Sequence, residues 1–131
     1  MMRTMTGAEL KTIRESLYLS AKELATRLGL RSDRTIRHWE AEDDYYVIPE
    51  GVAATVLAWD KSVEDAVSRG LEEHKDATEV TFYRPEHGPF PGDELPNSRR
   101  LRYAYLARLR RCLEARGIKV TIKHAPSQPE E

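Results

Sequence analysis

Three arginines, Arg31, Arg34 and Arg37, follow one another at three-residue intervals in the N-terminal third of the chain, with Asp33 and His38 among them. Residues three or four apart share one face of a helix. Guanidinium groups on such a face can form paired hydrogen bonds with guanine or with phosphate. The spacing of Asp33, Arg34, Arg37 and His38 therefore indicates a helix face suited to nucleic acid, with Arg31 in the turn before it, and a solvated charged face is the alternative.

The other reactive side chains form no comparable pattern. The single cysteine, Cys112, follows an apolar stripe and is expected to be a small core residue. The histidines have no metal-site spacing, and they are His38, His74, His87 and His124. The sequence also has no phosphate-cradling glycine loop, nucleophile elbow or zinc motif. We therefore expect no catalytic residue, no metal and no cofactor.

The formal net charge of −1 conceals an uneven distribution along the 131 residues. Residues 1–39 carry a net charge of +4, residues 40–80 carry −9 and residues 81–131 carry +4. This length suits one domain or two very small ones and excludes a large multidomain enzyme. No apolar run approaches the roughly 20 residues of a membrane span, and the first residues lack the apolar stretch of a signal peptide. We therefore expect a cytoplasmic protein without a membrane partner.

Three short helices separated by turns are predicted for the first third of the chain. Thr6 with Glu9, and Ser20 with Glu23, have the spacing of capping boxes, in which a hydroxyl and a carboxylate satisfy backbone N–H groups at a helix start. Gly29 stands where a helix end favours positive φ. The predicted helices cover about residues 6–17, 20–28 and 32–39.

Further elements are predicted after an acidic loop. Apolar residues recur at three- and four-residue steps, which indicates one long helix, or two helices end to end, from about 49 to about 74. Short β-branched and aromatic runs indicate strands. The remaining predictions are a strand at 79–84, a proline-rich loop at 85–97, a helix at 98–116, a strand at 118–123 and a disordered end at 125–131.

The second and third short helices fit a helix-turn-helix, whose second helix enters the DNA major groove. Ala25 is small where the two helices cross, and Gly29 relieves the turn. Ser32 is placed to cap the third helix. Ile36 and Trp39 are expected to anchor that helix, so that its opposite face projects.

The residues of the two helices and the turn between them resemble a known family. The segments 20–25 and 32–40, with Gly29 between them, resemble the Cro/C1-type (XRE) helix-turn-helix family of bacterial and phage repressors over about residues 5–60. The interval after Gly29 is one residue longer than is usual in that family, so residues 30–32 form an extended turn.

The longer turn, the segment Val47 to Val52 and an appended part beginning with Phe82 and Tyr83 more closely resemble phage and plasmid regulators with an extra C-terminal domain, including anti-CRISPR-associated repressors. In such relatives the appended part makes the dimer. That implication agrees with the small size of the predicted strand-helix-strand unit, because a two-stranded sheet is marginal alone in water.

The resemblance implies two sets of DNA contacts. The implied base-reading positions are Asp33, Arg34, Arg37 and His38. Asp33 could accept a hydrogen bond from cytosine or orient an arginine. The implied phosphate-binding positions are Ser20, Ala21, Lys22, Arg27, Arg31, Ser32 and Thr35.

We therefore expect a mainly α protein with an N-terminal five-helix Cro/C1-type bundle (5–75), a small C-terminal β-α-β dimerisation unit (76–124) and a disordered tail (125–131). The expected function is a DNA-binding transcriptional regulator, a repressor that acts as a homodimer on an inverted repeat in double-stranded DNA. One alternative is an antitoxin or adaptor that uses the helix-turn-helix as a scaffold for a protein partner.

The other alternative is an RNA-binding regulator, which is raised by the arginines of the last predicted helix. These arginines are Arg99, Arg100, Arg102, Arg108, Arg110 and Arg111. We expect them to be solvated or paired with acidic residues of 60–79 rather than to form a second nucleic-acid surface.

Overall fold

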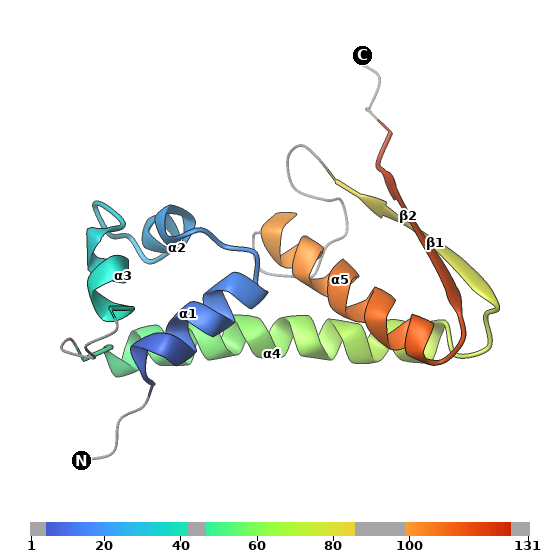
Figure 1. The fold of residues 1–131 in the computed structure, drawn as a ribbon, viewed down its shortest axis with the longest axis horizontal. Helices are drawn as coiled ribbons and strands as arrows, with labels where there is room; N and C mark the ends of the chain where they lie inside the picture. The colour runs from blue at the N-terminus through green and yellow to red at the C-terminus, as the bar shows by residue number, and fades with distance from the viewer. Residues whose placement is uncertain (1–4, 42–46, 86–98, 127–131) are drawn as a thin grey trace. The chain divides into compact units, whose positions relative to one another are not determined.

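The computed structural model describes residues 5–41, 47–85 and 99–126, which are mainly helical (Figure 1). The elements are α1 (Gly7–Ser16), α2 (Ala21–Arg27), α3 (Arg34–Trp39), α4 (Glu50–Glu73), β1 (Glu79–Arg84), α5 (Arg99–Ala115) and β2 (Lys119–His124). The chain divides into two compact units, Met1–Lys61 and Ser62–Glu131. None of the helices in these described ranges is long and apolar enough to cross a membrane.

Both predicted capping boxes are present. The Glu9 backbone N–H donates to the Thr6 hydroxyl at 3.0 Å, and the Thr6 N–H donates to the Glu9 carboxylate at 3.1 Å. Ser20 and Glu23 repeat these bonds at the start of α2. These bonds satisfy N–H groups that a helix start otherwise leaves without an intrahelical acceptor.

The core of the first unit consists of the apolar residues that face inward from these short helices. Leu10, Leu24, Ala25 and Ile36 are buried, as their spacing predicts. Trp39 is only half-buried, although we expected it to be a core residue. Other buried residues of this unit are Met5, Leu17, Leu19, Ile48, Ala53 and Val56.

A single helix, α4, forms where the sequence allowed one helix or two. Its buried residues Val56, Val63 and Val67 continue at helical spacing, so no local signal breaks the helix. Residues 5–41 and 47–75 therefore contain four helices, whereas we expected a five-helix bundle. The division between the two units falls within α4, while we predicted a boundary near residue 75.

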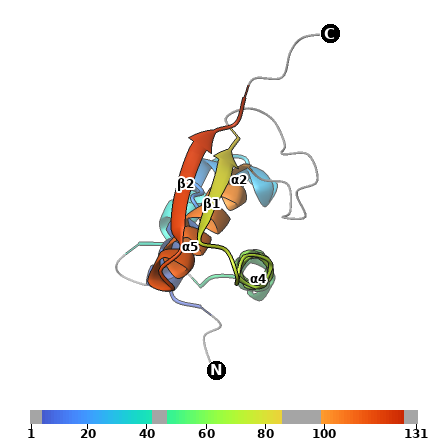
Figure 2. The same ribbon diagram turned by 90° about the vertical axis from the view of Figure 1, so that its right-hand side faces the viewer.

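The second unit contains a parallel pair of strands with a helix between them in the sequence. The register runs from Glu79 opposite Lys119 to Arg84 opposite His124. β1 has the predicted bounds, and β2 begins and ends one residue later than predicted. Helix α5 packs against both strands and lies on one face of the pair (Figure 2). The buried residues of α5 include Leu101, Leu109 and Leu113.

Within this unit the end of α4 approaches α5 closely at a glycine. A Cβ atom on Gly70 would lie 2.8 Å from a methyl carbon of Leu109 and 2.9 Å from the Tyr105 hydroxyl. Most of the predicted loop at 85–97 and of the predicted tail lies outside the described residues; of those two segments the structure describes residues 85, 125 and 126.

Candidate nucleic-acid interface

Helix α3 carries two exposed arginines on the side away from its buried residue. Ile36 is fully buried, and α3 packs against α2. Arg34 and Arg37 are exposed. In the described ranges Arg34 forms no ion pair, whereas the Arg37 guanidinium is paired with Asp33 at 3.0 Å. The helix therefore presents one unpaired and one oriented guanidinium to solvent.

The start of α3 differs in detail from the prediction. Asp33 occupies the N-cap position, but its side chain forms no capping hydrogen bond. The Ser32 hydroxyl accepts the backbone N–H of Arg34 at 3.3 Å instead. Ser32 is thus a local acceptor at the helix start, one residue earlier than the N-cap itself.

An ion pair that sequence reasoning missed holds the other end of α3. The Arg14 side chain donates from Nε and Nη2 to the two carboxylate oxygens of Glu40, at 2.8 Å each, and from Nη1 to the carbonyl of Leu19 at 2.9 Å. The hydrogen bond to Glu40 raises the pKa of Arg14 above its ordinary value. The two residues are 26 positions apart, so no local spacing could have indicated this pair.

A second missed contact brings the start of α1 against the same end of α3. A Cβ atom on Gly7 would overlap the backbone carbonyl of Trp39 and lie 3.2 Å from the Cα of Glu40. Because backbone atoms cannot turn aside as a flexible side chain can, only glycine fits there. Gly7 and Arg14 together fix the position at which α3 ends.

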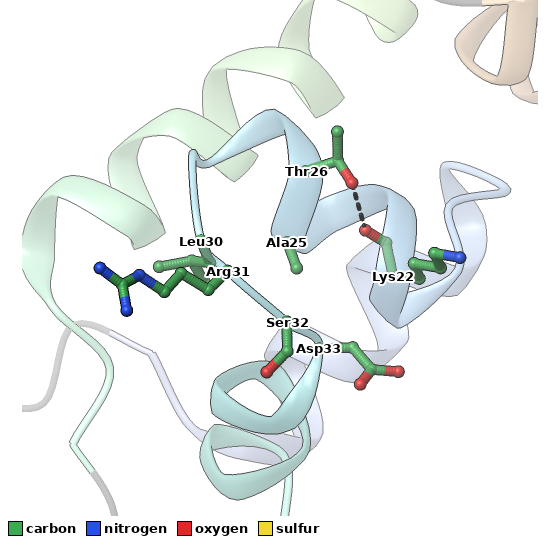
Figure 3. Close-up of a pocket in the computed structure, with 7 residues that line it drawn as sticks. All are labelled: Lys22, Ala25, Thr26, Leu30, Arg31, Ser32 and Asp33. Carbon is green, nitrogen blue, oxygen red and sulfur yellow. Dashed lines mark hydrogen bonds between the residues drawn. The ribbon is translucent and has the colours of Figure 1, made fainter.

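A cleft of about 350 Å³ lies between α2 and the segment that leads into α3 (Figure 3). Lys22 and Arg31 are its cationic lining residues, and Asp33 is its acidic one. Their side chains lie on opposite sides of the view, with Arg31 on the left and Lys22 and Asp33 on the right. Lys22 and Arg31 are exposed and form no ion pair within the described ranges. Both are therefore available to an anion such as a backbone phosphate.

Thr26 is a residue of this surface that sequence reasoning missed. It lines the cleft beside Lys22, and its hydroxyl donates to the Lys22 carbonyl at 3.0 Å (Figure 3). Its position four residues after Lys22 on the same helix was the available signal.

Ser20 differs from the expectation of a free backbone donor. Its N–H donates to the Glu23 carboxylate at 3.1 Å, and its hydroxyl accepts from the Glu23 N–H at 3.0 Å. A phosphate at Ser20 would have to replace the first of these bonds. Ala21, the next residue, begins α2 and is partly buried.

The remaining predicted contact residues are less accessible than Arg34. Thr35 and His38 of α3 are half-buried, as is Arg27 in the last turn of α2. Arg27 lines a second shallow cleft with Lys22, Glu23 and Thr26. The structure thus brings Lys22, Arg27 and Thr26 to one side of α2.

Three arginines of α5 have contacts within their own unit. Arg108 donates to Glu64 at 2.7 Å, which is a partner from the expected acidic segment. Arg110 donates to Glu114 on its own helix at 2.8 Å. The guanidinium of Arg102 lies 4.8 Å from the centroid of the Tyr105 ring. These contacts favour the ion-paired interpretation of this helix.

The described ranges contain no group of three or more histidine, cysteine, aspartate or glutamate residues that could hold a metal ion. Cys112 is partly buried in α5. Comparison with known protein families finds no match, and comparison with curated proteins finds none either.

Proposed function

We propose that this protein is a sequence-specific DNA-binding transcriptional regulator of the Cro/C1 helix-turn-helix kind, a repressor that acts as a homodimer in the cytoplasm. The observation that carries the proposal is the arrangement of α3. This helix buries Ile36 against the core, packs on α2 and directs Arg34 and Arg37 outward. A helix of this kind can enter the major groove and reach base edges.

The two types of contact have different expected roles. Arg34, which is exposed and unpaired within the described ranges, can form two hydrogen bonds to one guanine. Lys22 and Arg31 in the cleft are suited to phosphate, where a cation adds affinity without reading sequence. We assign base reading to the α3 face and positioning on the duplex to the cleft.

We further propose that the second unit forms the dimer. Its described residues form a sheet of two strands with α5 on one face, while the opposite face includes the exposed residues Glu79, Tyr83 and Lys123. A two-stranded sheet is marginal alone, and a second copy would extend or cover it. Two copies of the first unit related by a two-fold axis would bind an inverted repeat whose half-sites are about 34 Å, or one helical turn, apart.

The test is a gel shift with a DNA fragment from upstream of the protein's own gene, run against a random duplex of equal length at two salt concentrations. The wild-type chain should prefer the upstream fragment at both. Arg34→Ala should weaken binding to that fragment by about 1–3 kcal/mol and bind the random duplex almost as before.

Lys11→Ala is the matched control, because it removes one exposed positive charge of the same unit outside α2 and α3. It should leave the preference for the upstream fragment unchanged. Equal losses for Arg34→Ala on both duplexes would refute base reading by Arg34. A chain that is dimeric by sedimentation yet shows no preferred DNA would favour the scaffold for a protein partner, and a preference for a transcript over DNA would favour the RNA-binding regulator.

A further inference from the structure

Asp33 directly precedes α3, but its carboxylate does not cap the helix. Asp33 has helical backbone angles (φ −79°, ψ −1°), and its side chain forms no hydrogen bond to the first N–H groups of α3. Ser32 provides the acceptor there. The capping role, which usually explains an aspartate at this position, is therefore absent.

The Asp33 carboxylate is instead engaged with Arg37, one turn further along α3. Its Oδ2 accepts from Nε of Arg37 at 3.2 Å and from Nη2 at 3.0 Å. The Arg37 side chain is 72% exposed and that of Asp33 is 30% exposed. An exposed pair of this kind adds at most about 1 kcal/mol to stability, so its main physical effect is to hold the guanidinium in one direction.

The pair leaves Arg37 able to bind a second acceptor. A guanidinium has five N–H donors, and Asp33 accepts hydrogen bonds from two of its nitrogens. The donors of Nη1 and the second donor of Nη2 remain on the outer edge. That edge has the geometry for the paired acceptors O6 and N7 of guanine.

Asp33 also affects the charge of the surface beside it. It is the acidic lining residue of the cleft that contains Lys22 and Arg31. A carboxylate that lines the same cleft repels backbone phosphate, which is present in every DNA sequence. Such repulsion weakens binding to all DNA unless a correct base compensates for it, which is how an unfavourable group increases discrimination.

We propose that Asp33 is a positioning and specificity-determining residue, which holds Arg37 toward a guanine and opposes binding to DNA that lacks that guanine. This inference rests on the proposed function. It assigns Asp33 to act through Arg37 rather than to accept a hydrogen bond from a base itself.

The experiment measures dissociation constants of five chains for the upstream fragment and for a random duplex at one salt concentration. The chains are the wild type, Asp33→Ala, Arg37→Ala, the double variant and Asp76→Ala. Asp33→Ala should weaken binding to the upstream fragment by up to about fivefold, because Arg37 loses the pair that fixes its orientation. It should also strengthen binding to the random duplex by about threefold, because one negative charge is removed.

The double variant separates positioning from direct contact. Once Arg37 is alanine, the further change Asp33→Ala should no longer weaken binding to the upstream fragment, because the two residues act as one unit. Asp76→Ala removes an exposed carboxylate from the turn after α4. It should leave the ratio of the two affinities unchanged, and thermal unfolding monitored by circular dichroism should show that all five chains are folded.

Two results would overturn the inference while leaving the proposed function intact. One is a loss from Asp33→Ala that persists in the Arg37→Ala background, which would make Asp33 a direct reader. The other is an unchanged ratio of affinities for the two duplexes in Asp33→Ala. Equal affinity of the wild type for both duplexes would overturn the proposed function, and this inference with it.

Discussion

Arg14 at the end of α1 and Glu40 at the end of α3 form a two-point ion pair with both N–O distances at 2.8 Å. The side chains are 11% and 7% exposed, so this pair is shielded from solvent and salt. It joins α1, which carries no predicted DNA contact, to α3, which carries Arg34 and Arg37. The orientation of α3 therefore depends on a residue outside both α2 and α3.

Replacing Glu40 by glutamine should destabilise the fold by about 3 kcal/mol, because Arg14 would remain buried without a counter-charge. Urea unfolding followed by circular dichroism measures this loss. The control is Glu72→Gln, which breaks the exposed pair of Glu72 and Lys75 and should lower the free energy of unfolding by less than about 1 kcal/mol. Similar losses of unfolding free energy in the two variants would show that the Arg14–Glu40 pair stabilises the fold no more than an exposed pair does.

The loss in Glu40→Gln should not depend on pH between about pH 6 and 10. Arg14 has its pKa raised by the hydrogen bond to Glu40. A raised pKa gives a stabilisation that is complete below the unfolded-state pKa and disappears only as the pH rises through the folded-state value. For arginine both values lie beyond this range. Unfolding curves at several pH values check the prediction, and a difference between the two chains that shrinks toward pH 10 would contradict it.

Replacing Gly7 by alanine should destabilise the first unit by about 1–3 kcal/mol, because the new methyl group would overlap the backbone at Trp39 and Glu40. Gly51→Ala is the matched control in the first turn of α4. A Cβ atom there meets nothing within 4 Å, so this change should stabilise the protein by about 0.5–1 kcal/mol. Thermal unfolding of the two variants should therefore shift in opposite directions.

Replacing Tyr18 by glycine should stabilise the fold by about 0.5–1 kcal/mol. Tyr18 follows α1 with φ of 63°, in a left-handed conformation that disfavours residues with a Cβ atom. Its side chain is 46% exposed, so its removal leaves no cavity in the core. Tyr18→Ala retains the Cβ atom and should give no gain. A melting temperature that is equal for the two variants would show that the backbone is not strained.

Replacing Lys22 by alanine should weaken binding to all DNA and reduce the salt dependence. Each phosphate contact contributes about 0.9 to the slope of log K against log salt concentration. The slope should therefore decrease in magnitude by about one in Lys22→Ala, on the upstream fragment and on the random duplex alike. An unchanged slope would remove Lys22 from the set of phosphate contacts.

Local signals predicted much of the secondary structure. The two capping boxes indicated where α1 and α2 begin. Gly29, whose φ is 74°, indicated the turn that follows α2. β1 begins at Glu79 and ends at Arg84, as the run of β-branched and aromatic residues indicated. Each of these features depends on neighbours within a few positions, which is why the sequence alone reveals them.

Features that join distant residues were not predictable in the same way. The pairing of Arg14 with Glu40 and the contact of Gly7 with the end of α3 depend on how the helices pack, and packing has no fixed spacing in the sequence. The ion pair in which Arg37 donates to Asp33 is an intermediate case. Its four-residue spacing was visible, but whether the two side chains meet could be seen only in the side-chain geometry.

The parallel pairing of β1 with β2 affects the order in which the chain can fold during synthesis. Glu79 lies opposite Lys119, so β1 has no partner strand until forty further residues have been made. The first unit ends at Lys61 and contains none of these strands. Because domains generally fold as units and N-terminal ones first, the first unit can fold on the ribosome before the second unit is complete.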